Sequence, residues 1–309
     1  MPADPTPDST LDPTPDSTLQ AITATIQSVS GSAGPSVVSI GRNGRGSGFV
    51  IAAGRVLTSA HNLRDQTVAV TFADGRSEQG SVHAVDADGD LVVVDVPTGA
   101  VAPLTFAAQL PTLGAAVVAI GRGGHRSRTT LGFVSAVDQS FHGPRGRVVR
   151  GSVEHTAALA RGSSGGPVLN TAGEVVGINT HRVGDGFYLA RATDEALRAR
   201  ITELVEGRSV QRRTLGVAIA PGNVASQLRQ AVGLPERDGV LVRGVDESGP
   251  AGRAGVLVGD LIVGLGDTAI ASVDDLQDAL DSVTTDSVQL ALVRGVDDVT
   301  LTVTFSAPS

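Results

Sequence analysis

The segment RGSSGGPVLNTAGEVVGINT occupies residues 161–180 and carries the most informative pattern in the chain. Its first half places two serines among glycines, and its second half has the short β-branched run that is typical of a strand. Because glycine has no Cβ, a turn of this composition lets backbone N–H groups point toward a bound group. The segment therefore predicts a serine presented by a tight turn next to a β-strand.

Short valine-rich runs, separated by glycine, aspartate and proline, continue on both sides of this segment between residues 21 and about 192. They include SVVSIG (36–41), GFVIAAGRVLTSA (48–60), VAVTF (68–72), LVVVDV (91–96), AAVVAIG (115–121) and TTLGFVSAV (129–137). Such runs are typical of an all-β barrel or sandwich, and they are too numerous for one small barrel. We therefore expect a mainly β region with two barrels, divided near residues 97–112.

One helix follows the last of these strands. The apolar positions at i, i+4, i+7 and i+8 from Leu197 share a helical face, which Thr193 or Asp194 can cap and Gly207 can end. Residues 208–213 are polar and have no periodicity, so we interpret them as a linker.

The C-terminal region alternates strand and helix patterns. Strand runs occur at LGVAIA (215–220), GVLVRGVD (239–246), DLIVGLG (260–266), SVQLALV (287–293) and VTLTVTF (299–305). Helices are expected over residues 223–232 and after Ser272, which forms a capping box with Asp275. This alternation predicts an α+β domain.

The N-terminus is a repeat, because DPTPDSTL at residues 4–11 recurs at residues 12–19. Proline, aspartate, serine and threonine cannot build a core, so this part of the sequence predicts a disordered tail. The expected organisation is a tail over 1–20, a two-barrel domain over 21–207, a linker over 208–213 and an α+β domain over 214–309.

Composition excludes several classes of function. The chain has 309 residues, a net charge of −8 and no cysteine, and all of its basic residues are arginine or histidine. The absence of lysine excludes Schiff-base and P-loop chemistry, and the absence of cysteine excludes thiol nucleophiles and cysteine-ligated zinc. An acidic chain without a basic run is unsuited to nucleic acid. We therefore expect no cofactor, no metal and no nucleic-acid partner.

Targeting signals are equally sparse in this sequence. No stretch of 18 apolar residues occurs, and residues 1–20 lack the basic and apolar regions of a secretory signal. We expect no membrane span. The location is open: cytoplasmic if Met1 is the native start, and cell envelope or secreted if the chain is a trimmed form.

Three separate segments supply a histidine, an aspartate and a serine: TSAH (58–61), VDADGDLVVVDV (85–96) and the glycine-rich turn. A serine hydroxyl is a weak nucleophile unless an imidazole takes its proton, and a buried carboxylate must then orient that imidazole. These needs predict a catalytic triad of His61, one aspartate among Asp86, Asp88 and Asp90, and one serine, either Ser163 or Ser164. Backbone N–H groups of Gly162 and Ser164 would stabilise the oxyanion.

Several motifs together resemble the HtrA (DegP-like) serine proteases. TSAHNL resembles their histidine motif, GDLVVVDV their aspartate motif, and RGSSGGPVLNTAGEVVGINT their serine motif. LGVAI, PAGRAGVLVGDLIVGLG and SVDDLQDAL resemble the PDZ domain that follows the protease domain in this family. The resemblance implies a two-barrel trypsin-like domain followed by an α+β PDZ domain.

The resemblance also selects among neighbouring candidates. Asp86 and Asp88 compete with Asp90, but the family's aspartate directly precedes the apolar strand. The sequence DADGD could also begin an EF-hand loop, but the glycine and glutamate that such a loop requires are missing. Ser163 competes with Ser164, and the family's nucleophile directly precedes Gly-Gly. The other five histidines are expected on the surface or in loops.

The resemblance implies a serine endopeptidase that cleaves unfolded or misfolded polypeptides through an acyl-enzyme. It also implies C-terminal peptide binding at Leu215, Gly216 and Val217 of the PDZ domain, which regulates cleavage, and a homotrimer as a possible assembly. The alternative hypothesis is a protease-like chaperone or scaffold that binds peptides without cleaving them.

Overall fold

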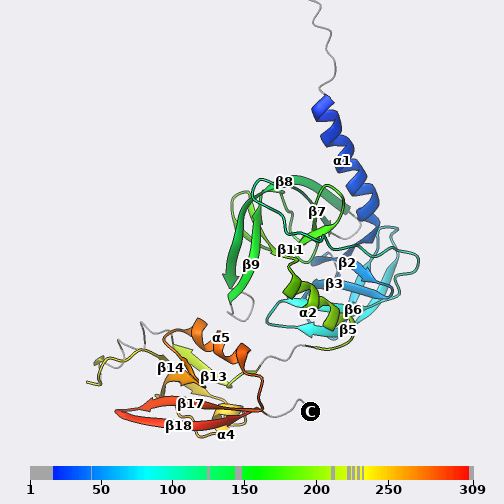
Figure 1. Ribbon diagram of the computed structural model, residues 1–309. Helices are drawn as coiled ribbons and strands as arrows, with labels where there is room; N and C mark the ends of the chain where they lie inside the picture. Colours follow the sequence, from blue (N-terminus) through cyan, green and yellow to red (C-terminus); the bar gives the residue numbers. More distant parts are fainter. Residues whose placement is uncertain are drawn as a thin grey trace, which may run out of the picture. The chain divides into compact units, whose positions relative to one another are not determined.

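The computed structural model describes residues 17–42, 44–123, 126–142, 148–209, 213–220 and 233–305, with residues 224, 227, 230 and 231. The chain forms two compact units, one made of residues 1–141 and 149–209 and the other of residues 142–148 and 210–309 (Figure 1).

The first unit contains two closed barrels of six strands each, which confirms the expected two-barrel architecture. The first barrel has the order β1-β2-β3-β6-β5-β4. Its strands are β1 (Val37–Ile40), β2 (Gly46–Ala52), β3 (Arg55–Ser59), β4 (Thr67–Thr71), β5 (Ser77–Asp86) and β6 (Leu91–Asp95). Short 3-10 turns, η1 (Gly34–Ser36) and η2 (Ala60–Asn62), precede β1 and follow β3.

The second barrel has the order β10-β11-β12-β9-β8-β7. Its strands are β7 (Ala116–Gly123), β8 (Arg126–His142), β9 (Val148–His155), β10 (Pro167–Leu169), β11 (Val175–Gly184) and β12 (Phe187–Ala192). Helix α2 (Glu195–Val205) follows, and the Asp194 side chain caps it by accepting a hydrogen bond from the Leu197 N–H.

A single hydrophobic core joins the two barrels and α2. Phe49 and Leu57 of the first barrel, Ile120 and Ile178 of the second, and Leu204 of α2 belong to one buried cluster. Because this apolar surface is shared, the barrels are held in a fixed relation, and loops from both can build one site at their junction.

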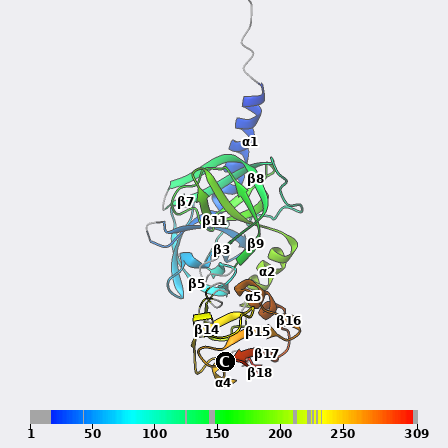
Figure 2. The same cartoon turned by 90° about the vertical axis from the view of Figure 1, so that its left-hand side faces the viewer.

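Helix α1 (Ser17–Ala33) differs from expectation, because strands were predicted from residue 21 and a disordered tail through residue 20. Residues 1–16 lie outside the described residues, and residues 17–20 belong to the helix. The helix carries several β-branched residues, which made its sequence resemble strands, but Val29 and Ala33 near its C-terminus are buried in the core of the barrels. Figure 2 shows the rest of α1 projecting away from the barrels.

The second unit is an α+β domain with the sheet order β13-β14-β15-β17-β18. Its elements are β13 (Val217–Ala220), β14 (Val240–Val245), α4 (Pro250–Arg253), β15 (Leu261–Leu265), β16 (Thr268–Ala269), α5 (Val273–Ser282), β17 (Ser287–Arg294) and β18 (Asp297–Thr304). The predicted capping box at Ser272 and Asp275 is present at the start of α5.

Two expected segments fall largely outside the described residues. They are the helix over 223–232 and the middle of the linker over 208–213. Among the helices that can be described, none combines the length and hydropathy that a bilayer crossing requires.

Candidate active site

The end of β3 presents His61 to Asp90. His61 lies in η2, and its Nδ1 is 2.7 Å from Asp90 Oδ2, while its backbone N–H donates to Asp90 Oδ1 at 2.9 Å. The Asp90 side chain is only 2% exposed, whereas that of His61 is 35% exposed. A buried carboxylate thus fixes the ring through Nδ1 and leaves Nε2 on the open side.

Asp90 has a left-handed backbone, with φ of 55°. Aspartate tolerates this conformation better than most residues do, and it ends the turn that leads into β6. The competing Asp86 has a different task, because its Oδ1 accepts the Gly89 N–H at 2.9 Å and holds the turn closed. The geometry therefore brings Asp90 rather than Asp86 to the imidazole.

The glycine-rich turn owes its shape to two left-handed glycines. Gly162 has φ of +84° and Gly165 has φ of +82°. A Cβ on Gly165 would lie 2.4 Å from the Ser47 carbonyl oxygen, so the turn touches the first barrel directly. Ser163 is buried at 6% exposed, whereas Ser164 is half-buried, which leaves Ser164 as the more accessible serine.

The Ser164 hydroxyl donates to the Thr180 carbonyl oxygen at 2.8 Å. In the described part of the chain no hydrogen bond joins Ser164 Oγ to His61 Nε2. Catalytic hydrogen bonds are often long or unformed without substrate and tighten in the complex. For the imidazole to take the Ser164 proton, the hydroxyl must exchange the Thr180 carbonyl for His61 Nε2.

Asn62 ties the histidine segment to the serine turn, and sequence reasoning missed this residue. Its Nδ2 donates to the Ser164 carbonyl oxygen at 3.0 Å and to Thr58 Oγ1 at 2.9 Å. The Ser47 N–H donates to the same Ser164 carbonyl at 2.9 Å. The only signal in the sequence was the position of Asn62 directly after the histidine.

The two predicted oxyanion donors are unengaged. Among the described residues, the backbone N–H groups of Gly162 and Ser164 have no acceptor, whereas that of Ser163 donates to the Ala160 carbonyl at 3.2 Å. Both residues are half-buried, so these N–H groups are free to donate to an oxygen atom of a ligand, as the predicted oxyanion site requires.

A pocket of about 230 Å³ opens beside Ser164. Its walls come only from the second barrel, between Leu159 and Tyr188, and include Asn179 and Arg182. The Arg182 guanidinium pairs with Asp185 at 2.8 Å, which partly neutralises its charge. The pocket lies where a side chain next to the scissile bond would fit.

His155 supports this pocket from inside and is not at the surface, contrary to expectation. It is fully buried, its Nε2 lies 3.0 Å from Asn179 Oδ1, and its ring stacks on Tyr188. Burial lowers the pKa of His155, while the hydrogen bond with Asn179 and the charge of Glu154 act in the opposite direction. His83 is also half-buried and hydrogen-bonded, within β5.

The second unit holds the predicted peptide-binding loop. The carbonyl of Leu215 accepts the Ala251 N–H at 2.9 Å, and that of Gly216 accepts the Asp246 N–H at 2.8 Å. Because the N–H and C=O of a trans peptide point in opposite directions, the N–H groups of Gly216 and Val217 face away from these contacts. The next strand, β13, is at the sheet edge, where an extended peptide could pair.

Within the described ranges, no group of three or more histidine, aspartate or glutamate side chains is placed to hold an ion.

A two-barrel fold with this histidine, aspartate and serine arrangement defines the class of trypsin-like peptidases, here followed by an α+β domain. Comparison with known proteins agrees with this class. The family described as trypsin-like peptidase domain matches residues 46–178, and the PDZ domain family matches residues 215–305.

Curated relatives narrow the class to a family. HhoA of Synechocystis sp., which is named as a serine protease, is 36% identical over 279 residues that make up 84% of this chain and 70% of the relative. Mitochondrial serine protease HTRA2 of Bos taurus is 32% identical over 278 residues, or 84% of this chain and 59% of the relative. The chain belongs to the HtrA (DegP-like) family of serine proteases.

Solved structures share the fold. A serine endoprotease from Yersinia pestis superimposes with a TM-score of 0.66 at 25% identity, covering 90% of this chain and 96% of that one. The HtrA-type protease AlgW, solved with a decapeptide, gives a TM-score of 0.71 at 22% identity, covering 92% and 99%. The second likeness is one of fold alone.

Proposed function

We propose that the chain is a serine endopeptidase that cleaves unfolded or misfolded polypeptides through an acyl-enzyme. The observation that carries this proposal is the 2.7 Å contact between His61 Nδ1 and the buried Asp90, beside a serine held in a glycine turn. HtrA membership supports the reaction class.

Each residue has one task in the proposed reaction. Ser164 Oγ attacks the substrate carbonyl carbon as His61 Nε2 takes its proton, and Asp90 stabilises the imidazolium. The N–H groups of Gly162 and Ser164 donate to the oxyanion. The C–N bond breaks as His61 returns the proton to the leaving amine, and water then hydrolyses the ester by the same route.

The direct test uses a fluorophosphonate probe and mass mapping of the modified residue. We expect labelling at Ser164 in the wild type and none in Ser164→Ala or His61→Ala. Failure of the probe to label the wild type, even with unfolded protein present, would contradict the proposed endopeptidase function. The contact of Ser164 Oγ with Thr180 would then favour the alternative, a scaffold that protects clients without cutting, and Ser164→Ala would protect them equally well.

We further propose that peptide C-termini bind at Leu215, Gly216 and Val217 and regulate cleavage. The outward N–H groups of the loop and the free edge of β13 support binding. The proposed domain organisation is a protease domain over 21–207 and a PDZ domain over 214–309, and the proposed assembly is a homotrimer. Cleavage of an unfolded substrate with and without a C-terminal peptide tests the regulation.

A further inference from the structure

A second pocket, in the first barrel, differs in character from the pocket beside Ser164. It has a volume of about 350 Å³ and lies among the β1–β2 connection, β4, β5 and the segment after η2. Arg42, Arg45 and Arg64 line it, with Asp65 as the one acidic residue. The chain as a whole carries a net charge of −8, so this pocket is positively charged in a molecule that is otherwise acidic.

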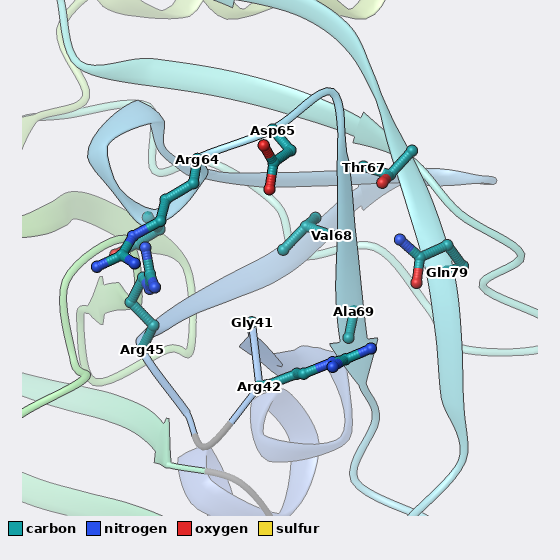
Figure 3. A pocket seen from close by; sticks show the side chains of 10 residues that line it. Gly41, Arg42, Arg45, Arg64, Asp65, Thr67, Val68, Ala69 and Gln79 are labelled. Atoms are coloured by element: carbon teal, nitrogen blue, oxygen red, sulfur yellow. The ribbon is translucent and has the colours of Figure 1, made fainter.

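Arg45 and Arg64 are arranged to share an anion. Figure 3 shows Arg45 and Arg64 pointing toward one another from two different segments, and Arg42 extending along another wall. All three are exposed, and among the residues that can be described none forms an ion pair, not even with Asp65. Like charges that converge without a partner favour the binding of a carboxylate, which a guanidinium matches with two parallel hydrogen bonds.

The pocket adjoins the proposed catalytic residues from the first barrel. Asn62, which lines it, directly follows His61 and donates to the Ser164 carbonyl oxygen at 3.0 Å. On the facing loop, the Gly44 carbonyl oxygen would lie 2.4 Å from a Cβ on Gly162. The arginine pocket and the pocket beside Ser164 share no residue, so the two flank the reacting serine from different barrels.

The chemistry assigns each pocket a side of the scissile bond. His61 delivers its proton to the leaving amine, so the substrate residues on the C-terminal side of the scissile bond lie next to the imidazole. Asn62 and Arg64 continue directly from that histidine. We propose that the arginine pocket is a specificity site for an aspartate or glutamate of the substrate on the C-terminal side of the cleaved bond. This inference rests on the proposed endopeptidase function.

The cleavage experiment compares matched substrates. A cleavage site is first mapped in an unfolded protein substrate. Fluorescence-quenched peptides with the sequence of that site then carry Asp or Asn at each of the first three positions after the cleaved bond, one position at a time. We expect at least one Asp peptide to show a kcat/KM about fivefold above its Asn partner, equivalent to about 1 kcal/mol for an exposed charge pair. The combined variant Arg42→Gln, Arg45→Gln, Arg64→Gln should bring the ratio to about one.

Two controls separate charge from folding. Arg128→Gln alters an exposed arginine of β8 that does not line the pocket, and it should keep the wild-type ratio. High salt should shrink the wild-type ratio, because the screening length falls from about 10 Å at 0.1 M to about 3 Å at 1 M. An Asp to Asn ratio of one in the wild type at every position would overturn the inference.

A binding experiment makes the inference independent of catalysis. Ser164→Ala is titrated with fluorescent peptides that begin at the leaving-group side and carry an amidated C-terminus, which removes the carboxylate that the PDZ loop would capture. We expect the Asp peptide to bind about fivefold more tightly than the Asn peptide, and the arginine variant to abolish the difference. Equal affinities would overturn the arginine site, whereas absent labelling of Ser164 would overturn only the endopeptidase.

Discussion

Asn62 Nδ2 donates a hydrogen bond to the Ser164 carbonyl oxygen at 3.0 Å, although 102 residues separate the two in sequence. This bond joins the His61 segment to the glycine-rich turn of Ser164 across the junction of the barrels. Asn62 is buried, so its loss would leave space and an unpaired carbonyl lone pair. The position of His61 relative to Ser164 thus depends on a residue outside the proposed triad.

Asn62→Ala should therefore slow labelling of Ser164 by a fluorophosphonate about threefold to tenfold, because one buried hydrogen bond contributes about 0.5–1.5 kcal/mol. The measurement is the second-order labelling rate beside the thermal unfolding midpoint. Asn170→Ala is the matched control, since that side chain also holds a turn but lies away from Ser164. Equal slowing in both variants would show that Asn62 acts only through stability.

Asp90→Asn should reduce kcat about 10³- to 10⁴-fold with little change in fold, because an amide stabilises neither the right tautomer nor the imidazolium. Asp88→Asn, two residues earlier in the same turn, is the control and should lose less than tenfold. Peptide hydrolysis rates decide between them. Comparable losses in the two variants would contradict the assignment of Asp90.

His155 predicts a dependence of stability on pH. Because burial lowers its folded pKa below the ordinary value of about 6.5, the unfolded chain binds more protons in the window between the two values. This contribution to stability is complete above about pH 6.5 and is lost as pH falls through the lowered pKa. Asn179 and Tyr188 contact the ring, Glu154 adds a nearby charge, and all three remain in every variant.

The test compares thermal unfolding of the wild type and His155→Gln at pH 7.5 and pH 5.5. We expect the wild type to lose more stability than the variant between these values, since glutamine keeps a hydrogen-bonding side chain and does not titrate. Parallel losses in the two proteins would mean that His155 does not titrate differently on folding.

Gly216→Val should abolish the binding of C-terminal peptides to the PDZ domain. The residue has φ of +75°, which side chains with a branched Cβ rarely adopt, and a Cβ there would lie 3.2 Å from Gly249 Cα. We expect fluorescence anisotropy to show that a peptide with a free C-terminal carboxylate binds at least tenfold more weakly to the variant than to the wild type. An amidated peptide serves as the reference that lacks the carboxylate. Gly295→Val is the control, because Gly295 also has a positive φ of 65° but open space around it. This variant should unfold at a temperature similar to that of Gly216→Val and should still bind the free peptide.

Much of the architecture followed from local patterns. The alternation of valine-rich runs predicted two barrels, and Ser272 with Asp275 predicted the start of α5, because a capping box is made by residues three apart. Helix α1 was missed because its β-branched residues resemble a strand, and the decisive burial of Val29 and Ala33 comes from the barrels. His155 was misplaced for the same reason: nothing adjacent in sequence reveals that a strand buries it.

The sequence by itself determined the residue types that the chemistry needs: a histidine after a strand, an aspartate before one, and a serine among glycines. The glycines take a left-handed backbone conformation that other residues adopt only with strain. These are local properties, and short motifs carry them. Tertiary structure alone decided that Asn62 reaches Ser164, that Ser164 donates to Thr180, and that three arginines from two separate segments line one pocket. The first contact joins residues 102 apart in sequence, and it forms only because the two barrels close around a shared core. The other two arise within one barrel each, because the strands of that barrel fold back on one another and bring separate segments together.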